Sequence, residues 1–420
     1  MRGKRWIWPV GILLLFFLAP GSLPAADVRF QSSTQYLWYK DPFLDKNQSD
    51  IVEYLSIGAP AIDNGGRFSA FGYGRVSRQF NSGEAEIFSN SDDILGRLYY
   101  MYLNYAVPGN RGDIRLGRQF VSVGAGAGTI DGLRIDARNL GPLSFSVFAG
   151  YDVRFRETTD LSRDGDYLTG AAVGGEFLKE GAVLHHTNIE VSYLRKYNEP
   201  DIVREMLGVH ADQGIYKKAK AYLDWRYDLL HEANSEFLAG VKLNPFSRIV
   251  TITGEYFSSY PNFDADSIFT VFAVSRYWEA LGRVDYIVNP RTTLYASYTR
   301  ADYDGPTADI GTLGVRFRPE KIKGLGIRAA VDLRSGYPGD LTGFDLSADY
   351  AFGKANLGAG VTYDVIQRDS MTDDFSAKRY WLAGSYEVFK NMTAKLRLED
   401  KETRQFANEF SGRAALDVRF

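Results

Sequence analysis

The sequence predicts an all-β protein, a transmembrane antiparallel up-and-down β-barrel of about 22 strands, within a range of about 18 to 24. Three observations support this prediction. Short segments alternate between apolar and polar residues along almost the whole chain, tight turns alternate with longer loops, and the last segment alternates up to a terminal Phe420. Helical periodicity of comparable length is absent from the sequence.

The alternation has the two-residue period of a strand that faces two different environments. Residues 143–155 place Leu143, Phe145 and Val147 on one face, with Ser144 and Ser146 on the other. Elsewhere the polar face carries full charges, including Arg328, Asp332, Arg334, Lys395, Arg397 and Glu399. A closed barrel with a wet lumen accommodates such a face, and closure removes the strand edges that lipid could not satisfy.

The connections fall into two sets. One set is tight and rich in Gly, Asn and Pro, which supply the backbone angles of short hairpin turns. It comprises residues 63–66, 108–112, 139–142, 179–181, 244–245, 289–290, 321–324, 353–356 and 390–391. The other set is longer and polar, at about 40–50, 80–94, 156–166, 259–276 and 368–376. Short turns on one side and longer loops on the other are typical of outer-membrane barrels, and an even strand number predicts that both termini are periplasmic.

The chain begins with the features of a secretory signal peptide. Arg2, Lys4 and Arg5 precede a short apolar run, and Ala25 or Ala26 ends the segment. We therefore expect a signal peptide at residues 1–26 and a single outer-membrane β-barrel domain at residues 27–420. No cysteine is present, which excludes disulfides, a lipid-modified cysteine and covalent haem attachment. The net charge of −3 indicates no nucleic-acid partner.

Aromatic residues gather near the ends of the predicted strands. The pairs are Tyr36 with Trp38, Trp225 with Tyr227, Tyr277 with Trp278, and Tyr380 with Trp381. Tyr and Trp favour membrane interfaces, where one end of the ring system is apolar and the other is wet. We therefore expect these pairs to lie in the aromatic belts of the barrel.

Two stretches resemble known outer-membrane proteins. Residues 114–120, IRLGRQF, followed by DGLRI at 131–135, resemble segments of bacterial porins. Residues 32–38 and 53–55 are similar to the barrel components of porin–cytochrome electron conduits. The first resemblance implies a porin-like channel for small solutes or ions. The second resemblance implies an alternative function, a scaffold that sheathes a multihaem cytochrome. We expect no cofactor in this chain itself, so the haem would belong to the cytochrome partner.

The two readings imply different partners. A barrel of 22 strands is wide and needs a plug or a constriction, so either a partner cytochrome fills the lumen or the strand number is 18 or fewer. A channel of 16 to 18 strands would be a homo-oligomer. In both readings the surroundings are outer-membrane lipid and lipopolysaccharide.

The candidate lumen residues lie on two neighbouring predicted strands, 112–121 and 130–138. They are Arg115, Arg118, Arg134, Asp136 and Arg138. A ladder of charges would select anions or orient an inserted partner, and general lumen polarity is the plainer explanation. Arg118 falls on the face of Leu116 and Phe120, so a bulge near Gly117 is expected.

Other motifs carry weaker signals. Residues 123–129, VGAGAGT, lack the Gly-Lys-Ser/Thr of a phosphate-binding loop and predict a flexible loop. Folding of this loop into the barrel is one possibility that the sequence leaves open. The acidic groups Asp92-Asp93, Asp160 with Asp164 and Asp166, and Asp373-Asp374 suit solvated loops better than Ca²⁺ sites. His185 and His186 would face opposite sides of a strand, and His210 and His231 form no metal motif. No nucleophile elbow or carboxylate pair stands out, so the sequence predicts a protein that is not an enzyme.

Overall fold

The computed structural model describes residues 28–41, 46–79, 94–153, 166–198, 200–246, 249–260, 276–367, 375–404 and 409–420. The expected signal peptide at 1–26 lies outside the described residues. The regular secondary structure of the described residues consists of β-strands. They are β1 Arg29–Asp41, β2 Lys46–Ala59, β3 Phe68–Gln79, β4 Ile94–Val107, β5 Gly112–Val123, β6 Gly126–Leu140, β7 Leu143–Asp152, β8 Asp166–Phe177, β9 Leu184–Asn198, β10 Asp201–Ile215, β11 Ala219–Asp228, β12 Ala233–Leu243, β13 Val250–Ser259, β14 Tyr277–Asn289, β15 Thr292–Asp302, β16 Thr307–Phe317, β17 Leu325–Gly336, β18 Asp340–Phe352, β19 Ala355–Gln367, β20 Phe375–Phe389, β21 Met392–Glu402 and β22 Glu409–Arg419.

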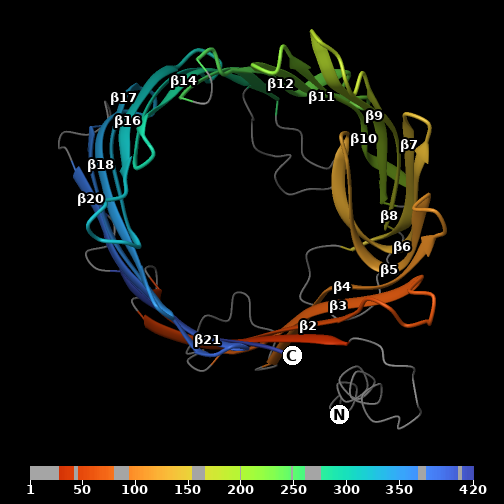
Figure 1. The fold of residues 1–420 in the computed structure, drawn as a ribbon, viewed down its shortest axis with the longest axis horizontal. Helices are drawn as coiled ribbons and strands as arrows, with labels where there is room; N and C mark the ends of the chain where they lie inside the picture. Colours follow the sequence, from red (N-terminus) through yellow and green to blue (C-terminus); the bar gives the residue numbers. More distant parts are fainter. Residues whose placement is uncertain are drawn as a thin grey trace.

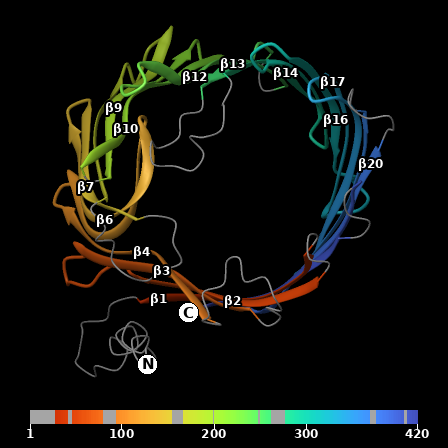
Figure 2. The ribbon, with the colours of Figure 1, turned by 180° about the vertical axis from the view of Figure 1, so that it is seen from behind.

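The 22 strands form one closed antiparallel sheet, which confirms the predicted strand number and fold class. Consecutive strands pair with each other, and β1 closes the ring by pairing with β22, from Gln31 opposite Arg419 to Tyr39 opposite Ser411. Viewed along the bore, the strands surround a central opening (Figures 1 and 2). Every strand pairs with a neighbour on both sides over at least part of its length, and such closure suits strands that lie in lipid.

The strand register separates an apolar outer face from a polar inner face. On β21, Leu396 lies opposite Ala414 on the outer face, while Arg397 lies opposite Arg413 on the inner face. Large exposed hydrophobic side chains such as Leu313 and Leu382 occupy the outer face along many strands. An apolar outer band with a polar interior is the arrangement that lipid outside and water inside require.

The two ends of the barrel differ as expected. All nine predicted tight turns lie at the end where β1 begins and β22 ends. There the backbone N–H of Phe420 donates to the carbonyl of Phe30 at 2.8 Å. The prediction of a loop at 40–50 was wrong, because β1 runs to Asp41 and β2 begins at Lys46. A polar segment can still be strand when it pairs along its whole length, as residues 46–50 do with β1.

The aromatic pairs are only partly at the lipid face. Tyr36 and Trp38 lie on the outer face, with their ring centroids 5.6 Å apart. Tyr277 and Trp381, by contrast, lie on the inner face of their strands, and the Arg397 guanidinium lies 5.1 Å from the Trp381 ring. Adjacent residues of a strand face opposite sides, so the expectation of aromatic belts was wrong for Tyr277 and Trp381.

The turn between β2 and β3 is held by one carboxylate. Asp63 accepts hydrogen bonds from the backbone N–H groups of Phe68 and Arg67, each at 2.8 Å, and from Gly65 at 3.2 Å. These bonds favour the charged form, with the one from Phe68 contributing most, and they lower the pKa of Asp63 below its ordinary value.

We predict that Asp63→Ala destabilises the barrel at neutral pH and not in acid. A group whose pKa is lowered by folding contributes stability above its unfolded pKa of about 3.9, and that contribution is lost as the pH falls through the folded pKa. Urea unfolding of both proteins in lipid vesicles at neutral and strongly acidic pH measures this difference. An equal loss of stability at both pH values would contradict the assignment.

Within the described residues, no helix has the length and apolar character of a membrane-spanning helix.

Candidate functional site

A hairpin formed by the ends of β5 and β6 leaves the barrel wall and lies inside the bore. β5 pairs with β4 only up to Arg118, and β6 pairs with β7 only from Ile130 onward. Between these points the two strands remain paired with each other up to Val123 opposite Gly126. Both ribbon views show this gold hairpin inside the ring, next to β10 (Figures 1 and 2). We call residues 119–129 the infolded hairpin.

Three glycines in register mark the line along which the wall bends. Gly117 lies opposite Gly132, and Gly132 lies opposite Gly150. Gly117 has a φ of 126°, which side chains rarely adopt, and a Cβ at Gly132 would lie 2.2 Å from the carbonyl oxygen of Ala149. The expected bulge near Gly117 was wrong, because the β4–β5 and β5–β6 registers run through without a shift. Glycine instead lets the backbones approach closely at the bend.

We predict that Gly132→Ala strongly destabilises the barrel. Its Cβ would meet backbone atoms of β7 rather than a flexible side chain. Forcing an extra carbon into a filled site typically costs about 1–3 kcal/mol. Urea unfolding in lipid vesicles measures the loss, and Gly254→Ala serves as the control because a Cβ there meets nothing within 4 Å. Equal stability of the two variants would contradict the account of the bend.

A small apolar core fixes the infolded hairpin to the inner wall. The hairpin contributes Val121, Val123 and Ala125, and the wall contributes Ile130, Phe148, Leu168, Ala172, Leu194 and Met206. Phe120 alternates with Val121 and lies on the opposite face of the hairpin, where its side chain is 61% exposed. The hairpin therefore presents one face to β7–β10 and the other, with Phe120, to the bore.

Hydrogen bonds complete the attachment at the tip. The N–H of Gly124 donates to Oε1 of Glu190 and the N–H of Ala125 donates to Oγ of Ser192, both at 2.8 Å. Nε of Arg226 donates to the carbonyl of Gly124 at 2.9 Å. Since Glu190, Ser192 and Arg226 come from β9 and β11, the polar groups of the tip find partners on the wall as the burial of backbone requires.

The VGAGAGT segment therefore forms the tip of a β-hairpin and not the predicted flexible loop. Val123 ends β5, Gly126 begins β6, and only Gly124 and Ala125 form the turn. The expected loop of seven residues was wrong, whereas its inward course is confirmed. The small side chains suit this place, because the tip lies against Ser192, Leu194 and the backbone of Gly208.

Arg118 is not a lumen residue. Its side chain is 2% exposed, and Nε and Nη2 donate to the two carboxylate oxygens of Asp131 at 2.7 and 2.8 Å. Nη1 donates to the carbonyl of Leu98 at 3.2 Å, on the part of β4 that β5 no longer pairs. The pair therefore holds the hairpin at the point where it leaves the wall.

The other four predicted lumen residues do lie together on the inner face. Arg115 lies opposite Arg134, and the Arg134 guanidinium donates to Asp136 at 3.0 and 2.9 Å. Arg138 forms an ion pair with Asp113, and Ser146 donates to Asp136 at 2.8 Å. Nε of Arg115 donates to Asn104 at 3.3 Å. Carboxylates thus neutralise Arg134 and Arg138, and Arg115 contacts an uncharged amide.

Sequence reasoning missed a set of aromatic side chains beside these arginines. We call it the aromatic track, and it consists of Tyr54, Phe71, Tyr73, Tyr99, Tyr100 and Tyr102 on β2, β3 and β4. Successive ring centroids lie 5.0–6.2 Å apart. Arg97 lies 4.9 Å from the Tyr99 ring, and Arg115 lies 5.8 Å from the Tyr102 ring. The sequence pattern that could have predicted this track is the alternation of Tyr residues at inward-facing positions of adjacent strands.

The remaining candidates form no site among the residues that the structure describes. Asp92, Asp93, Asp160, Asp164, Asp373 and Asp374 lie outside them, and Asp166 is buried at the start of β8. His185 and His186 are neighbours with ring centroids 5.4 Å apart, and His186 contacts Glu176. The described part of the chain holds no group of three or more His, Asp or Glu side chains that could bind a metal ion.

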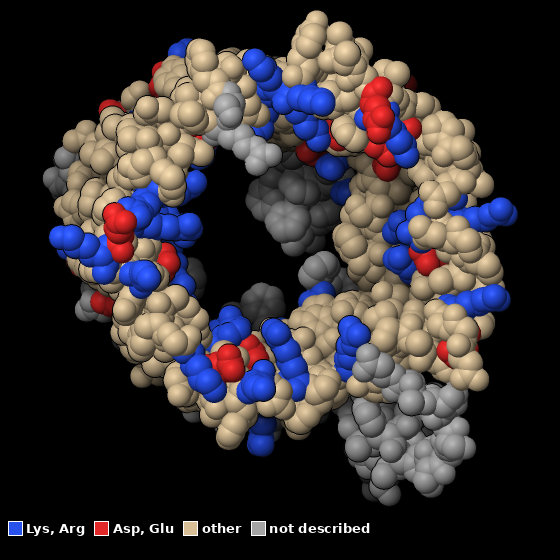
Figure 3. All heavy atoms as spheres, in the orientation of Figure 1, with Lys and Arg blue, Asp and Glu red and all other residues tan. Residues whose placement is uncertain are grey.

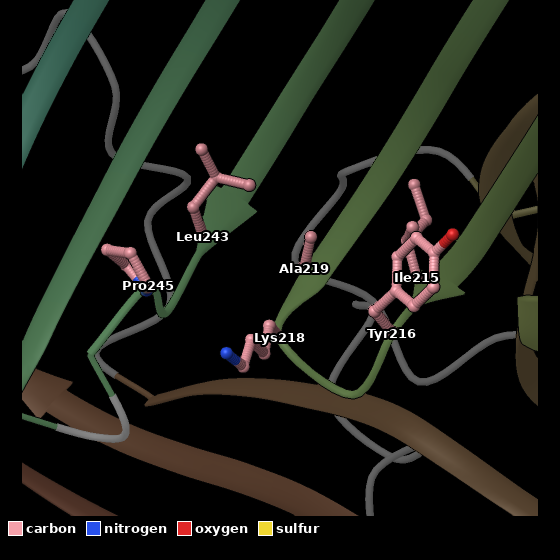
Figure 4. Close-up of a pocket in the computed structure, with 6 residues that line it drawn as sticks. All are labelled: Ile215, Tyr216, Lys218, Ala219, Leu243 and Pro245. Carbon is pink, nitrogen blue, oxygen red and sulfur yellow. The ribbon is translucent and has the colours of Figure 1, made fainter. Parts of the chain in front are cut away.

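A shallow apolar pocket lies at the tight-turn end, away from the hairpin (Figure 4). Tyr216 and Lys218 of the β10–β11 turn border it, together with Leu243 and Pro245 at the end of β12. Tyr216 is 61% exposed. Lys218 is the one charged side chain in this lining.

The space-filling view shows an opening through the ring, with Lys, Arg, Asp and Glu side chains along its rim (Figure 3). Charged side chains of the inner face form ion pairs. Arg379 with Glu399 and Lys395 with Asp417 are pairs between neighbouring strands, and Arg397 pairs with Glu399 within β21. A wet, charged bore can pass polar solutes, which an apolar core would exclude.

Comparisons with known proteins place the fold. No family model matches the sequence, and no curated protein matches it. The translocation pore of the P pilus usher PapC is 8% identical, covers 93% of this chain and 99% of its own, and has a TM-score of 0.51. OccAB3 of Acinetobacter baumannii is 8% identical over 94% of this chain and 100% of its own, with a TM-score of 0.48. OpdO of Pseudomonas aeruginosa is 12% identical over 94% of this chain and 96% of its own, with a TM-score of 0.47. With its closed ring of 22 strands, apolar outer face and charged bore, the chain shares the closed β-barrel fold of the PapC translocation pore.

Proposed function

We propose that this protein is a porin-like outer-membrane channel for small solutes or ions. The observation that carries the proposal is the charged bore of the closed barrel, narrowed from one side by the infolded hairpin. The strands of the wall pair with each other around the ring, and the inner face offers charges to hydrated solutes. The PapC protein, whose fold this chain shares, is a translocation pore, which supports the same class of function at the level of fold.

We further propose that the tight-turn end, where both termini lie, faces the periplasm. The tight turns gather at this end, whereas the connections at the other end include much longer ones, such as the one between β13 and β14. Bacterial barrels have short periplasmic turns and longer extracellular loops. An epitope tag after Phe420 should therefore stay inaccessible to antibody on intact cells, and surface labelling of the tag would contradict this orientation.

The test of the channel is electrical. Purified barrel inserted into planar lipid bilayers should give stable steps of ionic current in KCl. Absence of conductance from correctly folded protein would contradict the proposal.

A visible absorption spectrum of protein purified in mild detergent from its native membrane tests the alternative function. The chain has no cysteine for covalent haem attachment, so a haem band at fixed stoichiometry would come from a partner. Such a band would favour the sheath around a multihaem cytochrome, and we expect none.

A further inference from the structure

We infer that the aromatic track binds small aromatic carboxylates in the bore. This inference rests on the proposed channel function and names the class of solute that the channel would hold during passage. It joins three observations: rings that face the lumen, arginines at both ends of the ring series, and a constriction beside them.

The rings face the lumen because of the strand register. Tyr54 lies opposite Arg75, and Tyr73 lies opposite Tyr100, whereas the lipid-facing Met101 and Leu103 occupy the alternate positions of β4. A register shift after Tyr73 adds one residue to β4, which brings Tyr99 to the same group. Six rings in mutual contact on the wet face of a barrel form an extended aromatic surface, which departs from the inside–outside pattern and indicates a binding surface.

The rings form a continuous series across three strands. The Tyr73 ring stacks on Tyr54 at 6.2 Å and on Tyr99 at 5.0 Å between centroids, and it contacts Tyr100 at 5.5 Å. The series continues from Tyr100 to Tyr102 at 6.0 Å. All these side chains are half-buried, so each keeps surface open to the bore. A planar apolar solute can stack on such rings in offset or edge-to-face geometry.

Arginines flank the series along the axis of the barrel. Arg97 lies on β4 toward the loop end, with its guanidinium 4.9 Å from the Tyr99 ring. Arg115 lies on β5 toward the tight-turn end, over Tyr102, and donates to Asn104 through Nε. A guanidinium has five N–H donors in a plane that matches a carboxylate. Cations beside apolar rings therefore favour a solute that carries both an aromatic ring and a negative charge.

The infolded hairpin begins beside the track. Gly117, where the wall bends, lies opposite Tyr102, and the infolded hairpin begins two residues later. Phe120 on the bore-facing side of the hairpin adds one more exposed ring to the same part of the lumen. The track and the infolded hairpin therefore border the same part of the bore.

The experiment compares solutes that differ in one property. Benzoate, acetate, benzyl alcohol and benzylamine are added to single channels in KCl, and benzoate is also titrated by calorimetry into the detergent-solubilised barrel. We expect benzoate to block the current at a concentration about tenfold lower than acetate, because only benzoate offers a ring to stack. Benzylamine, whose charge is opposite, should block least.

Variants separate ring and charge. Tyr73→Leu combined with Tyr100→Leu should remove the advantage of benzoate over acetate, and Arg115→Gln should remove the advantage of benzoate over benzyl alcohol. Tyr295→Leu is the matched control, because Tyr295 is an inner-face ring between Arg283 and Arg316 that contacts no ring of the track.

The outcomes keep this inference apart from the channel proposal. Equal block by benzoate and acetate in a conducting barrel, without calorimetric binding, would overturn the inference and leave the channel standing. Benzoate binding that the Tyr73 and Tyr100 variant loses, in a barrel that does not conduct, would support the binding site and overturn the channel. Benzoate block that Tyr295→Leu weakens as much as the track variant would also overturn the inference.

Discussion

Replacing Arg118 by Ala is expected to lower the free energy of unfolding by about 3–5 kcal/mol, the range for breaking one half of a buried ion pair. The Arg118 side chain is 2% exposed and bonds to both carboxylate oxygens of Asp131 and to the carbonyl of Leu98. Its removal leaves the Asp131 carboxylate and one backbone carbonyl without these donors. Urea unfolding in lipid vesicles, followed by tryptophan fluorescence, measures the loss.

Two further variants give the control for this prediction. Arg115→Ala on the same strand should cost much less, because Arg115 lies at the wet inner face and its one bond to a side chain is to Asn104 at 3.3 Å. The double variant R118M/D131L should recover much of the loss, since an apolar pair replaces the charged one without leaving an unpaired group. If Arg118→Ala were as stable as Arg115→Ala, the proposed role of Arg118 in holding the base of the hairpin would be wrong.

Replacing Leu194 by Ala is expected to detach the infolded hairpin and increase the conductance. Leu194 is 2% exposed and packs in the core between the hairpin and the wall. Truncation of a buried Leu typically costs about 2–5 kcal/mol, and here the cost falls on the contact that holds the hairpin rather than on the strand pairing of the wall. Single-channel recording should show larger or fluctuating currents, and hydrogen exchange at Gly124 and Ala125 should become faster.

A lipid-facing truncation separates this effect from a general loss of stability. Leu382 is an exposed outer-face residue of β20, so Leu382→Ala should leave both the current and the hairpin amides unchanged. Conductance of the Leu194 variant equal to that of the unchanged protein would show that the hairpin does not limit the bore.

Much of the wall was predictable from the sequence, because a strand with lipid on one side and water on the other repeats every two residues. The segment 143–155, for example, corresponds to β7 at Leu143–Asp152. The tight turns were equally clear, since Gly, Asn and Pro have few other uses at such positions. The alternation of apolar and polar residues reflects the two environments of a strand. In these regions one face meets lipid and the other meets water along the whole strand.

The site was harder to predict for the same reason. In the infolded hairpin one face meets the wall and the other meets the bore, so Val121 and Val123 are buried inside the barrel and Phe120 is exposed to it. The alternating pattern was interpreted as lipid outside and water inside, and this interpretation cannot predict apolar residues that are buried within the barrel. Arg118 was accordingly assigned to the lumen, although its position on the face of Leu116 and Phe120 was the visible sign of an exception.

The aromatic track shows a second limit. Tyr is common at membrane interfaces, so a Tyr-rich strand such as β4 suggests the lipid face unless its register is known. The bulge near Tyr99 changes the face of residues on either side of it, and only the pairing of β3 with β4 reveals which rings meet. Specific sites in the lumen therefore depend on register, which the sequence states less clearly than strand number.

The most direct test of the channel account uses the absence of native cysteine. Phe120→Cys places a thiol on the bore-facing side of the infolded hairpin, and Val147→Cys places one on the lipid-facing side of β7. Single-channel current is recorded before and after a charged, membrane-impermeant thiol reagent is added. The account predicts a stepwise fall in current for the Phe120 variant and none for the Val147 variant. An unchanged current in a fully labelled Phe120 variant would contradict the claim that the bore conducts past the infolded hairpin.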